Sequence, residues 1–293
     1  MRPVTKHIGG WRKPWLVVVI GLFALLLAAC GDSDQSALTA TTTTLSSAST
    51  TVPVSTTTTT TPGERTFLLY FLRGSQLGVS QRSAGSADDP HFEEMTALVD
   101  GPNRTETAAG LSTDIPSGTD VRGLEIRSGI ATVNMSPSFV APGPAQELAG
   151  RVAQVVYTLT SSPSVTGVII EIGGTQLVNF GGINLSSAVG RAQVTGALPL
   201  ILLEQPAVGG SMMAKMTISG LTADAGTYEV QLLDPTGRLL ASVTNTAVAG
   251  GMFVQSVPIS ITSPETGTVR VFGRPTSTSQ PVQEYQFSIP INP

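Results

Sequence analysis

Between about residues 64 and 195, hydrophobic positions switch between a repeat of two and a repeat of three or four. Short apolar or alternating runs predict strands at 66–72, 77–82, 121–127, 130–135 and 167–172, with a hairpin return at 173–180. Helical spacing predicts helices from about 89 to 100, with Asp89 as N-cap and Pro90 as first residue, and from about 144 to 160. Ser128-Gly129 is the two-residue loop that right-twisted strands prefer. The region is therefore predicted to be a small α+β sandwich, with two helices on one mostly antiparallel sheet.

From residue 199 onward only strand patterns remain. Seven short runs predict an all-β sandwich, with strands at 199–205, 212–219, 226–233, 239–246, 252–261, 268–272 and 284–289. Since the region contains no cysteine pair, apolar side chains must supply its core; those expected there are Met213, Ile218, Val230, Leu232, Val243, Phe253, Val271 and Phe287. The predicted fold class is an α+β domain at 64–195 followed by an all-β sandwich at 199–293.

The first 29 residues have the pattern of a lipoprotein signal peptide. Four cations precede an uncharged apolar stretch at 15–27, which is too short for a comfortable membrane span. The sequence Leu27-Ala28-Ala29-Cys30-Gly31 resembles the bacterial lipobox, which implies cleavage before Cys30 and acylation of its thiol. Multiple acyl chains anchor a protein stably, so we expect a lipid-anchored extracytoplasmic protein. The alternative is an uncleaved membrane anchor with an inert thiol.

Residues 30–63 have the composition of a tether. They consist almost entirely of Thr, Ser and Ala, with Thr runs at 41–44 and 56–61. Such a segment has too little apolar surface to offset its chain entropy, which predicts a disordered spacer. The alternatives are a bare spacer and one that is O-glycosylated on its Thr runs.

Charge and composition exclude several classes of protein. The chain has 293 residues and a formal charge of −4. Removal of the four leader cations leaves 12 basic against 20 acidic side chains, which argues against a nucleic-acid partner. One Cys excludes a disulfide framework, and His91, the only His after the leader, excludes most His-ligated metal sites. We therefore expect no metal and no cofactor.

Four ordered blocks stand out in the first region, at 97–102, 110–121, 129–136 and 154–160. Their motif positions are Gly101, Pro102, Gly110, Leu111, Thr113, Pro116, Gly118, Thr119, Gly129, Val133 and Tyr157. Together the blocks resemble the GerM-type domain of bacterial sporulation and germination proteins. The resemblance implies a fold like the ring-building domains of envelope secretion complexes, and it carries over no catalytic residue. The second region is similar to the immunoglobulin-like module that often follows such domains.

The candidate chemistry is sparse. The densest polar cluster is a cation-site candidate, with helix capping and dipole compensation as the alternative; it consists of Asp88, Asp89, His91, Glu93 and Glu94. Glu125 and Glu171 could form an acid–base pair, although alternation puts Glu125 on the solvent face.

Other polar positions suit structural roles. Glu147 and Arg151 are spaced as an outward ion pair on the second helix. Lys215 is expected to be an outward charge on a strand, and the paired glycines 173–174 and 181–182 are expected in hairpin turns. No G-x-S-x-G elbow occurs in the sequence, which disfavours a serine hydrolase.

These observations favour a non-enzymatic envelope lipoprotein that acts as a scaffold or docking module. Its expected partners are the lipid bilayer through acylated Cys30, other copies of itself, and envelope, secretion or sensor proteins. The alternative is a receptor that binds peptidoglycan or another wall polymer in a groove between the two domains, without self-assembly. A third hypothesis is a wall-cleaving enzyme that uses Glu171.

Overall fold

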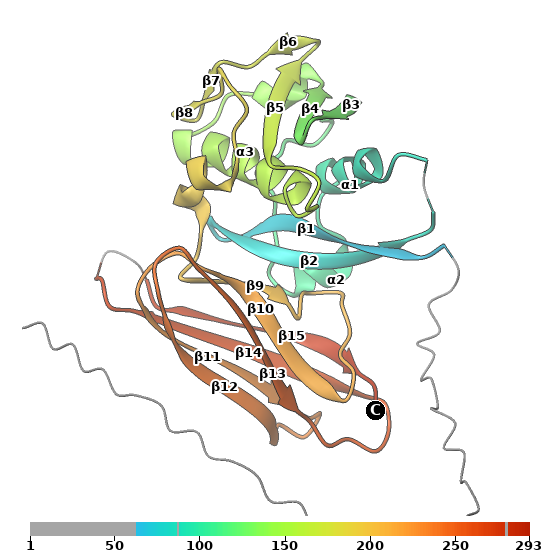
Figure 1. The fold of residues 1–293 in the computed structure, drawn as a ribbon, viewed down its shortest axis with the longest axis vertical. Coiled ribbons are helices and arrows are strands. Elements are labelled where there is room, and N and C mark those ends of the chain that lie inside the picture. The colour runs from blue at the N-terminus through green and yellow to red at the C-terminus, as the bar shows by residue number, and fades with distance from the viewer. Residues whose placement is uncertain (1–62, 87, 279–280) are drawn as a thin grey trace, which may run out of the picture. The chain divides into compact units, whose positions relative to one another are not determined.

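The computed structural model describes residues 63–86, 88–278 and 281–293. The chain divides into two compact units, residues 1–57 and 58–293, so all described residues belong to the second unit. Within this unit, mixed helices and strands up to residue 198 form what we call the first region, and the strands from residue 199 onward form the second region (Figure 1). The fold class is thus α+β followed by all-β, as predicted.

Besides the short pair of β7 (Asn179–Phe180) and β8 (Ile183–Asn184), the first region contains two sheets instead of the one predicted. Strands β1 (Arg65–Arg73) and β2 (Gln76–Ala84) pair only with each other as a long hairpin. The other sheet has the order β3-β4-β5-β6. Its strands are β3 (Val121–Arg127), β4 (Ile130–Met135), β5 (Gly167–Ile172) and β6 (Thr175–Gln176). The β4–β5 pair is parallel because a helix crosses over between them, so the sheet is mixed.

Helices α1 (Pro90–Val99) and α3 (Ala145–Leu159) lie between the hairpin and the β3–β6 sheet (Figure 1). The Asp89 carboxylate accepts a hydrogen bond from the Phe92 amide at 3.0 Å, which confirms the predicted N-cap of α1. A third helix, α2 (Arg104–Ala108), was not predicted; a capping box of Asn103 and Glu106 starts it. Short elements complete the region: η1 (Pro137–Val140), β7 (Asn179–Phe180), β8 (Ile183–Asn184), η2 (Arg191–Gln193) and η3 (Thr195–Ala197).

Arg151 on α3 corrects one prediction. Its side chain is buried rather than outward, and no ion pair joins it to Glu147 among the described residues. Its guanidinium donates to the carbonyls of Asp114 (2.8 Å), Phe139 (2.9 Å) and Ala141 (2.7 Å). A buried Arg can thus donate hydrogen bonds to loop carbonyls that no strand pairs with. Helical spacing alone does not reveal such an arrangement.

The second region is the predicted sandwich of seven strands. One sheet has the order β13-β10-β9 and the other β12-β11-β14-β15, with antiparallel pairing throughout. The strands are β9 (Ile201–Gln205), β10 (Lys215–Thr222), β11 (Gly226–Leu233), β12 (Leu239–Ala247), β13 (Gly251–Pro258), β14 (Glu265–Pro275) and β15 (Gln283–Ile291).

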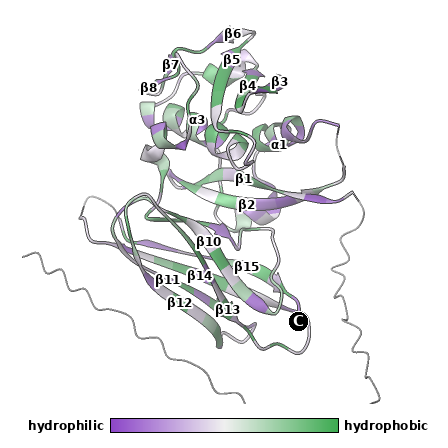
Figure 2. Ribbon diagram, in the orientation of Figure 1, coloured by the Kyte–Doolittle hydropathy of each residue, from purple (hydrophilic) through white to green (hydrophobic). Residues whose placement is uncertain are grey.

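The core of the sandwich matches the prediction at most positions. Figure 2 shows the alternation of hydrophobic and hydrophilic residues along its strands. Met213 is the exception, since it is half exposed and its neighbour Met212 is buried instead. Met212 lies before β10 and makes a bridge to Ile291, so it does not follow the alternation of the strand. Phe253 is partly buried and packs against Tyr228, with ring centroids 5.0 Å apart.

Candidate functional site

The predicted leader, lipidation site and tether lie outside the described residues. This applies to Leu27, Ala28, Ala29 and Cys30 and to the Thr-rich segment up to residue 62. Among the described residues, no helix is long and apolar enough to span a membrane.

The glycines among the motif positions lie at turns. Gly101, Gly110, Gly118 and Gly129 all have φ between 79° and 83°, a backbone region that glycine adopts without strain. Ser128 and Gly129 both have positive φ, as the tight turn of the β3–β4 hairpin requires.

The other motif positions stabilise the interior and the loop before β3. Leu111, Val133 and Tyr157 are buried. The Thr119 hydroxyl donates to the Pro116 carbonyl at 2.7 Å. The Thr113 hydroxyl accepts from the amide of Gln154 at 3.0 Å, and Pro102 directly follows the turn at Gly101.

Acidic side chains of the cluster around α1 form ion pairs with an arginine and do not surround a space for a cation. Arg65 on β1 donates to Glu93 at 2.6 Å and to Glu94 at 2.9 Å, and His91 Nδ1 lies 3.1 Å from Glu94. The sequence assigned these acids to the helix dipole and missed Arg65, which is 28 residues before Glu93. Among the described residues, no group of three acidic, His or Cys side chains is arranged to hold a metal ion.

The two carboxylates considered as an acid–base pair do not face each other. Glu125 lies opposite Thr132 across the β3–β4 pair, whereas Glu171 lies opposite Asn134 across the β4–β5 pair. The Glu125 side chain is exposed and pairs with Arg127, as expected for the solvent face.

Other expected positions have structural places. Lys215 is exposed at the start of β10. Both glycine pairs, 173–174 and 181–182, have positive φ at tight turns.

A polar cluster, the Arg191 cluster, joins the two regions. Arg191 donates to Glu204 of β9 at 2.9 Å and to the Tyr70 hydroxyl of β1 at 3.1 Å, and the Tyr70 hydroxyl also donates to Glu204. The guanidinium lies over the ring of Tyr157, 4.8 Å from its centroid. Burial, and secondly Glu204, raise the pKa of Tyr70 well above its usual value, and burial raises that of Tyr157 to about 12.

A second cluster, the Glu106 cluster, lies on the other side of the hairpin. Glu106 is buried and accepts from Arg82 at 2.6 and 2.8 Å, from Ser80 at 2.5 Å and from the Asn103 amide at 2.6 Å. Burial raises the pKa of this carboxyl, but the hydrogen bonds from Arg82, Ser80 and Asn103 together outweigh it and lower the pKa. Ser80 also donates to the carbonyl of Val208, so this cluster too reaches the second region.

Backbone contacts complete the junction. The Gln81 amide donates to the Val208 carbonyl at 2.7 Å, and the Val208 amide donates to the Val79 carbonyl at 3.3 Å. A Cβ on Gly209 would lie 2.6 Å from the Gln81 carbonyl oxygen, so glycine is required for this close approach. These hydrogen bonds therefore join the two regions at two places, Glu204 and Val208.

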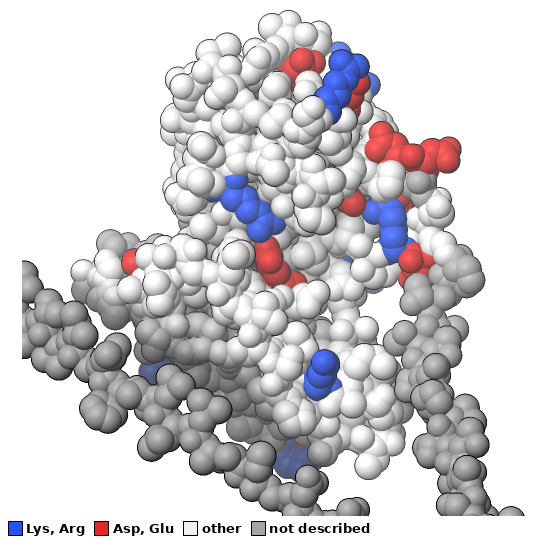
Figure 3. Space-filling view, in the orientation of Figure 1, with Lys and Arg blue, Asp and Glu red and all other residues white. Residues whose placement is uncertain are grey.

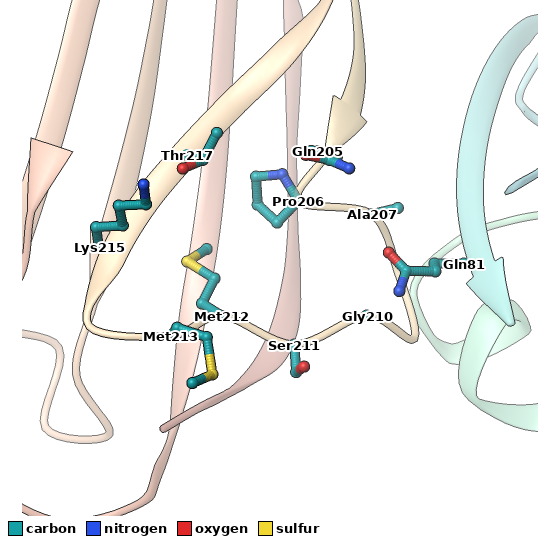
Figure 4. A pocket seen from close by; sticks show the side chains of 10 residues that line it. All are labelled: Gln81, Gln205, Pro206, Ala207, Gly210, Ser211, Met212, Met213, Lys215 and Thr217. Carbon is teal, nitrogen blue, oxygen red and sulfur yellow. The ribbon is translucent and has the colours of Figure 1, made fainter. Parts of the chain in front are cut away.

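A cavity of about 280 Å³, lined by both polar and apolar residues, lies beside this junction. Figure 4 shows Gln81 extending from β2 toward the loop at Gly210, with Lys215 and Thr217 on the opposite wall. The wall also includes Gln205 and Met213. Amides, a hydroxyl and one ammonium group can bind carbonyl, hydroxyl or carboxylate groups of a small polar ligand. This cavity and another of about 340 Å³, which lies between α2 and strands β14 and β15, are both lined by residues of the two regions, as the sequence predicted for a groove between the domains.

Comparison with known proteins identifies the first region. Residues 68–178 match the Germane family, described as "Sporulation and spore germination". No curated protein matches the chain. Among solved structures, the first GerMN domain of the sporulation protein GerM from Bacillus subtilis is 20% identical, with a TM-score of 0.38, over 44% of this chain and 98% of that one.

Two further solved structures are similar over part of the chain. The tandem GerMN domains of the same protein are 15% identical, with a TM-score of 0.40, over 64% of this chain and 62% of that one. A structure titled as a putative lipoprotein from Clostridium perfringens is 20% identical, with a TM-score of 0.33, over 45% of this chain and 91% of that one.

Proposed function

Because residues 68–178 form a GerM-type domain, we propose that this chain is an extracytoplasmic lipoprotein that docks other envelope components at the membrane. In this proposal Cys30 carries the lipid and the Thr-rich segment is the spacer. The two folded regions bind partners and catalyse no reaction. The domain family associates the docking with sporulation, germination or related cell-wall processes.

The observation that carries the docking role is the junction between the two regions. The Arg191 cluster connects them at Glu204, and the Glu106 cluster and the backbone pairing both connect them at Val208. A partner bound to one region is then held in a fixed orientation relative to the other region. A body with fixed surfaces loses less conformational entropy on binding than two flexibly linked domains would.

Cross-linking in intact cells tests this proposal. A photoreactive residue is placed in the full chain at Val178, Arg122 or Glu284, which are exposed positions in both regions. Docking predicts discrete cross-linked products in the membrane fraction, at some of these positions and not at others. The Cys30→Ser variant should lose both membrane retention and these products. The absence of any discrete product, or unchanged products from the Cys30→Ser variant, would contradict the proposal.

A second candidate function, wall-polymer binding, is favoured by the polar side chains in the cavity at the junction. Peptidoglycan offers amides, hydroxyls and carboxylates, which match Gln81, Thr217 and Lys215 in chemistry. The test is co-sedimentation of the unit from residue 58 onward with purified peptidoglycan. Wall binding predicts retention that Lys215→Gln weakens, whereas Arg122→Gln, which removes an exposed cation from β3, leaves it unchanged. Failure of the unmodified unit to sediment would exclude this function.

A further inference from the structure

One part of the second region carries no charged residue. From Leu239 to Pro264 there is no Asp, Glu, Lys or Arg, although charged residues occur on both sides of this stretch. It contains β12 and β13, which form edges of the two opposed sheets and contact each other between them. Figure 3 shows few charged atoms on the visible face of the second region. The two adjoining edge strands of the sandwich thus carry no charged side chain of their own.

Each of the other two sheet edges is hydrogen-bonded at one of its ends. At β15, the Met212 amide donates to the Pro290 carbonyl at 2.9 Å and the Asn292 amide donates to Met212 at 2.8 Å. At β9, the Gln283 side chain accepts from the Ile201 amide at 3.0 Å and donates to the Ile201 carbonyl at 2.8 Å. In the described part of the chain, no strand pairs with the outer edge of β12 or β13.

The open edge of β13 also lacks the features that usually prevent edge pairing. Natural edge strands are protected by charged residues, proline, bulges or short length. β13 is eight residues long, pairs with β10 without a bulge, and has its only proline at the last position. Met252 is 84% exposed and Val254 74% exposed on its outer face. Such an edge favours the addition of another strand.

We propose that β13 pairs antiparallel with β13 of a second copy, so that the two three-stranded sheets form one continuous sheet. A second copy is the occupant that the charge pattern favours, because it brings the same uncharged edge. No charge then loses its water on either side, whereas a charged edge would leave ions desolvated without partners. The proposal rests on the proposed function only in that the chain acts by binding.

Symmetry and the strand sequence fix the register. Side chains alternate between the two faces of a strand, and the cores of the two copies must lie on the same side of the shared sheet. The twofold axis must therefore pass through a residue that faces the same residue of the second copy, and not between two neighbouring residues. Centring on Val254 pairs residues 251–257 and leaves out Pro258, which has no amide hydrogen to donate. In this register Val254 faces the same residue of the second copy, and Met252 faces Ser256.

The geometry predicts a weak dimer. Seven paired residues span about 24 Å, and an edge two sheets thick buries on the order of 500 Å² per copy. This is below the roughly 800 Å² per partner of a standard interface. Anchoring on one membrane raises the local concentration, which strengthens a weak pairing without new contacts.

Light scattering over a concentration series tests the proposal, using the compact unit from residue 58 onward. We expect its mass to rise toward that of a dimer between about 10 μM and 1 mM, the range of weak association. Val254→Lys should weaken association at least tenfold, because it places two ammonium groups face to face. The matched control is Ser288→Lys, which adds the same charge at an exposed strand position of the other sheet and should behave like the unmodified unit. Thermal unfolding verifies that both variants fold.

Disulfide trapping tests the proposed register of the β13–β13 pair. The unit has no cysteine, so Val254→Cys introduces a single thiol. Oxidation should give a covalent dimer from Val254→Cys and at least tenfold less from Ser288→Cys. A constant monomer mass up to 1 mM, or association that Val254→Lys leaves unchanged, would overturn the proposal. Neither result affects membrane retention or the cross-links to other envelope components, so failure of the docking function is detected separately.

Discussion

Removal of Arg191 should uncouple the two regions. Its ion pair with Glu204 is 2.9 Å long, and the two side chains are only 26% and 22% exposed. Exposed ion pairs contribute about 0–1 kcal/mol, and breaking a buried pair costs about 3–5 kcal/mol. For this partly buried pair we expect Arg191→Ala to lower the free energy of unfolding by about 2 kcal/mol. In a unit of this size that corresponds to a melting temperature about 4–8 °C lower.

Differential scanning calorimetry on the unit from residue 58 onward measures this effect. The matched control is Arg238→Ala, which removes an ion pair of 3.0 Å whose arginine is 73% exposed. This control should change stability by less than about 1 kcal/mol. We expect a single transition in the unmodified unit and in Arg238→Ala, and a broadened or split transition in Arg191→Ala. Equal losses in the two variants, with one sharp transition in both, would refute the argument that the Arg191 cluster couples the regions.

Three further predictions concern pH and a turn. The lowered pKa of Glu106 means that its contribution to stability is present above about pH 4.3, its unfolded value, and is lost as pH falls through the folded pKa. Urea unfolding from pH 7 to pH 2.5 should thus show a shallower pH dependence in Glu106→Gln, and equal slopes would contradict this. The pKa of Tyr157 is raised to about 12, so its neutral form favours folding below pH 10, and this stability is lost between pH 10 and 12. Circular dichroism should therefore show less unfolding of Tyr157→Phe than of the unmodified unit in that range. Gly181→Ala should lower the free energy of unfolding by about 2–3 kcal/mol, because the new Cβ would lie 2.3 Å from the Ala149 amide nitrogen. Gly182→Ala, with open space around the new Cβ, should lower it by only about 1–2 kcal/mol. Equal urea midpoints for the two variants would refute the steric argument.

The sequence predicted the elements whose signals are local. The Ser128-Gly129 turn, the Asp89 cap and the seven strands of the sandwich each depend on neighbouring residues, and all are present. Elements that depend on distant partners were missed or misplaced. Arg151 has helical spacing typical of an exposed ion pair, but the carbonyls that bury it come from loops outside the helix, at 114, 139 and 141.

The junction between the regions had no signal in the sequence pattern. Tyr70, Arg191 and Glu204 are separated by more than 130 residues in total, and each alone suits an ordinary strand or loop position. The parallel β4–β5 pair was missed for a related reason, because hydrophobic alternation shows which face a residue occupies but not which strand lies beside it. The uncharged stretch 239–264 was readable in the sequence, but its position at the open sheet edge was not.

The account depends most on the lipid anchor, since the proposed docking takes place at the membrane surface outside the cytoplasm. The most direct measurement is the mass of the N-terminal peptide of the chain purified from the membrane fraction of its native cells. The account predicts that the peptide begins at Cys30 and carries the added mass of a diacylglyceryl group. An unmodified Cys30 within an intact leader, or a chain found only in the cytoplasm, would contradict it.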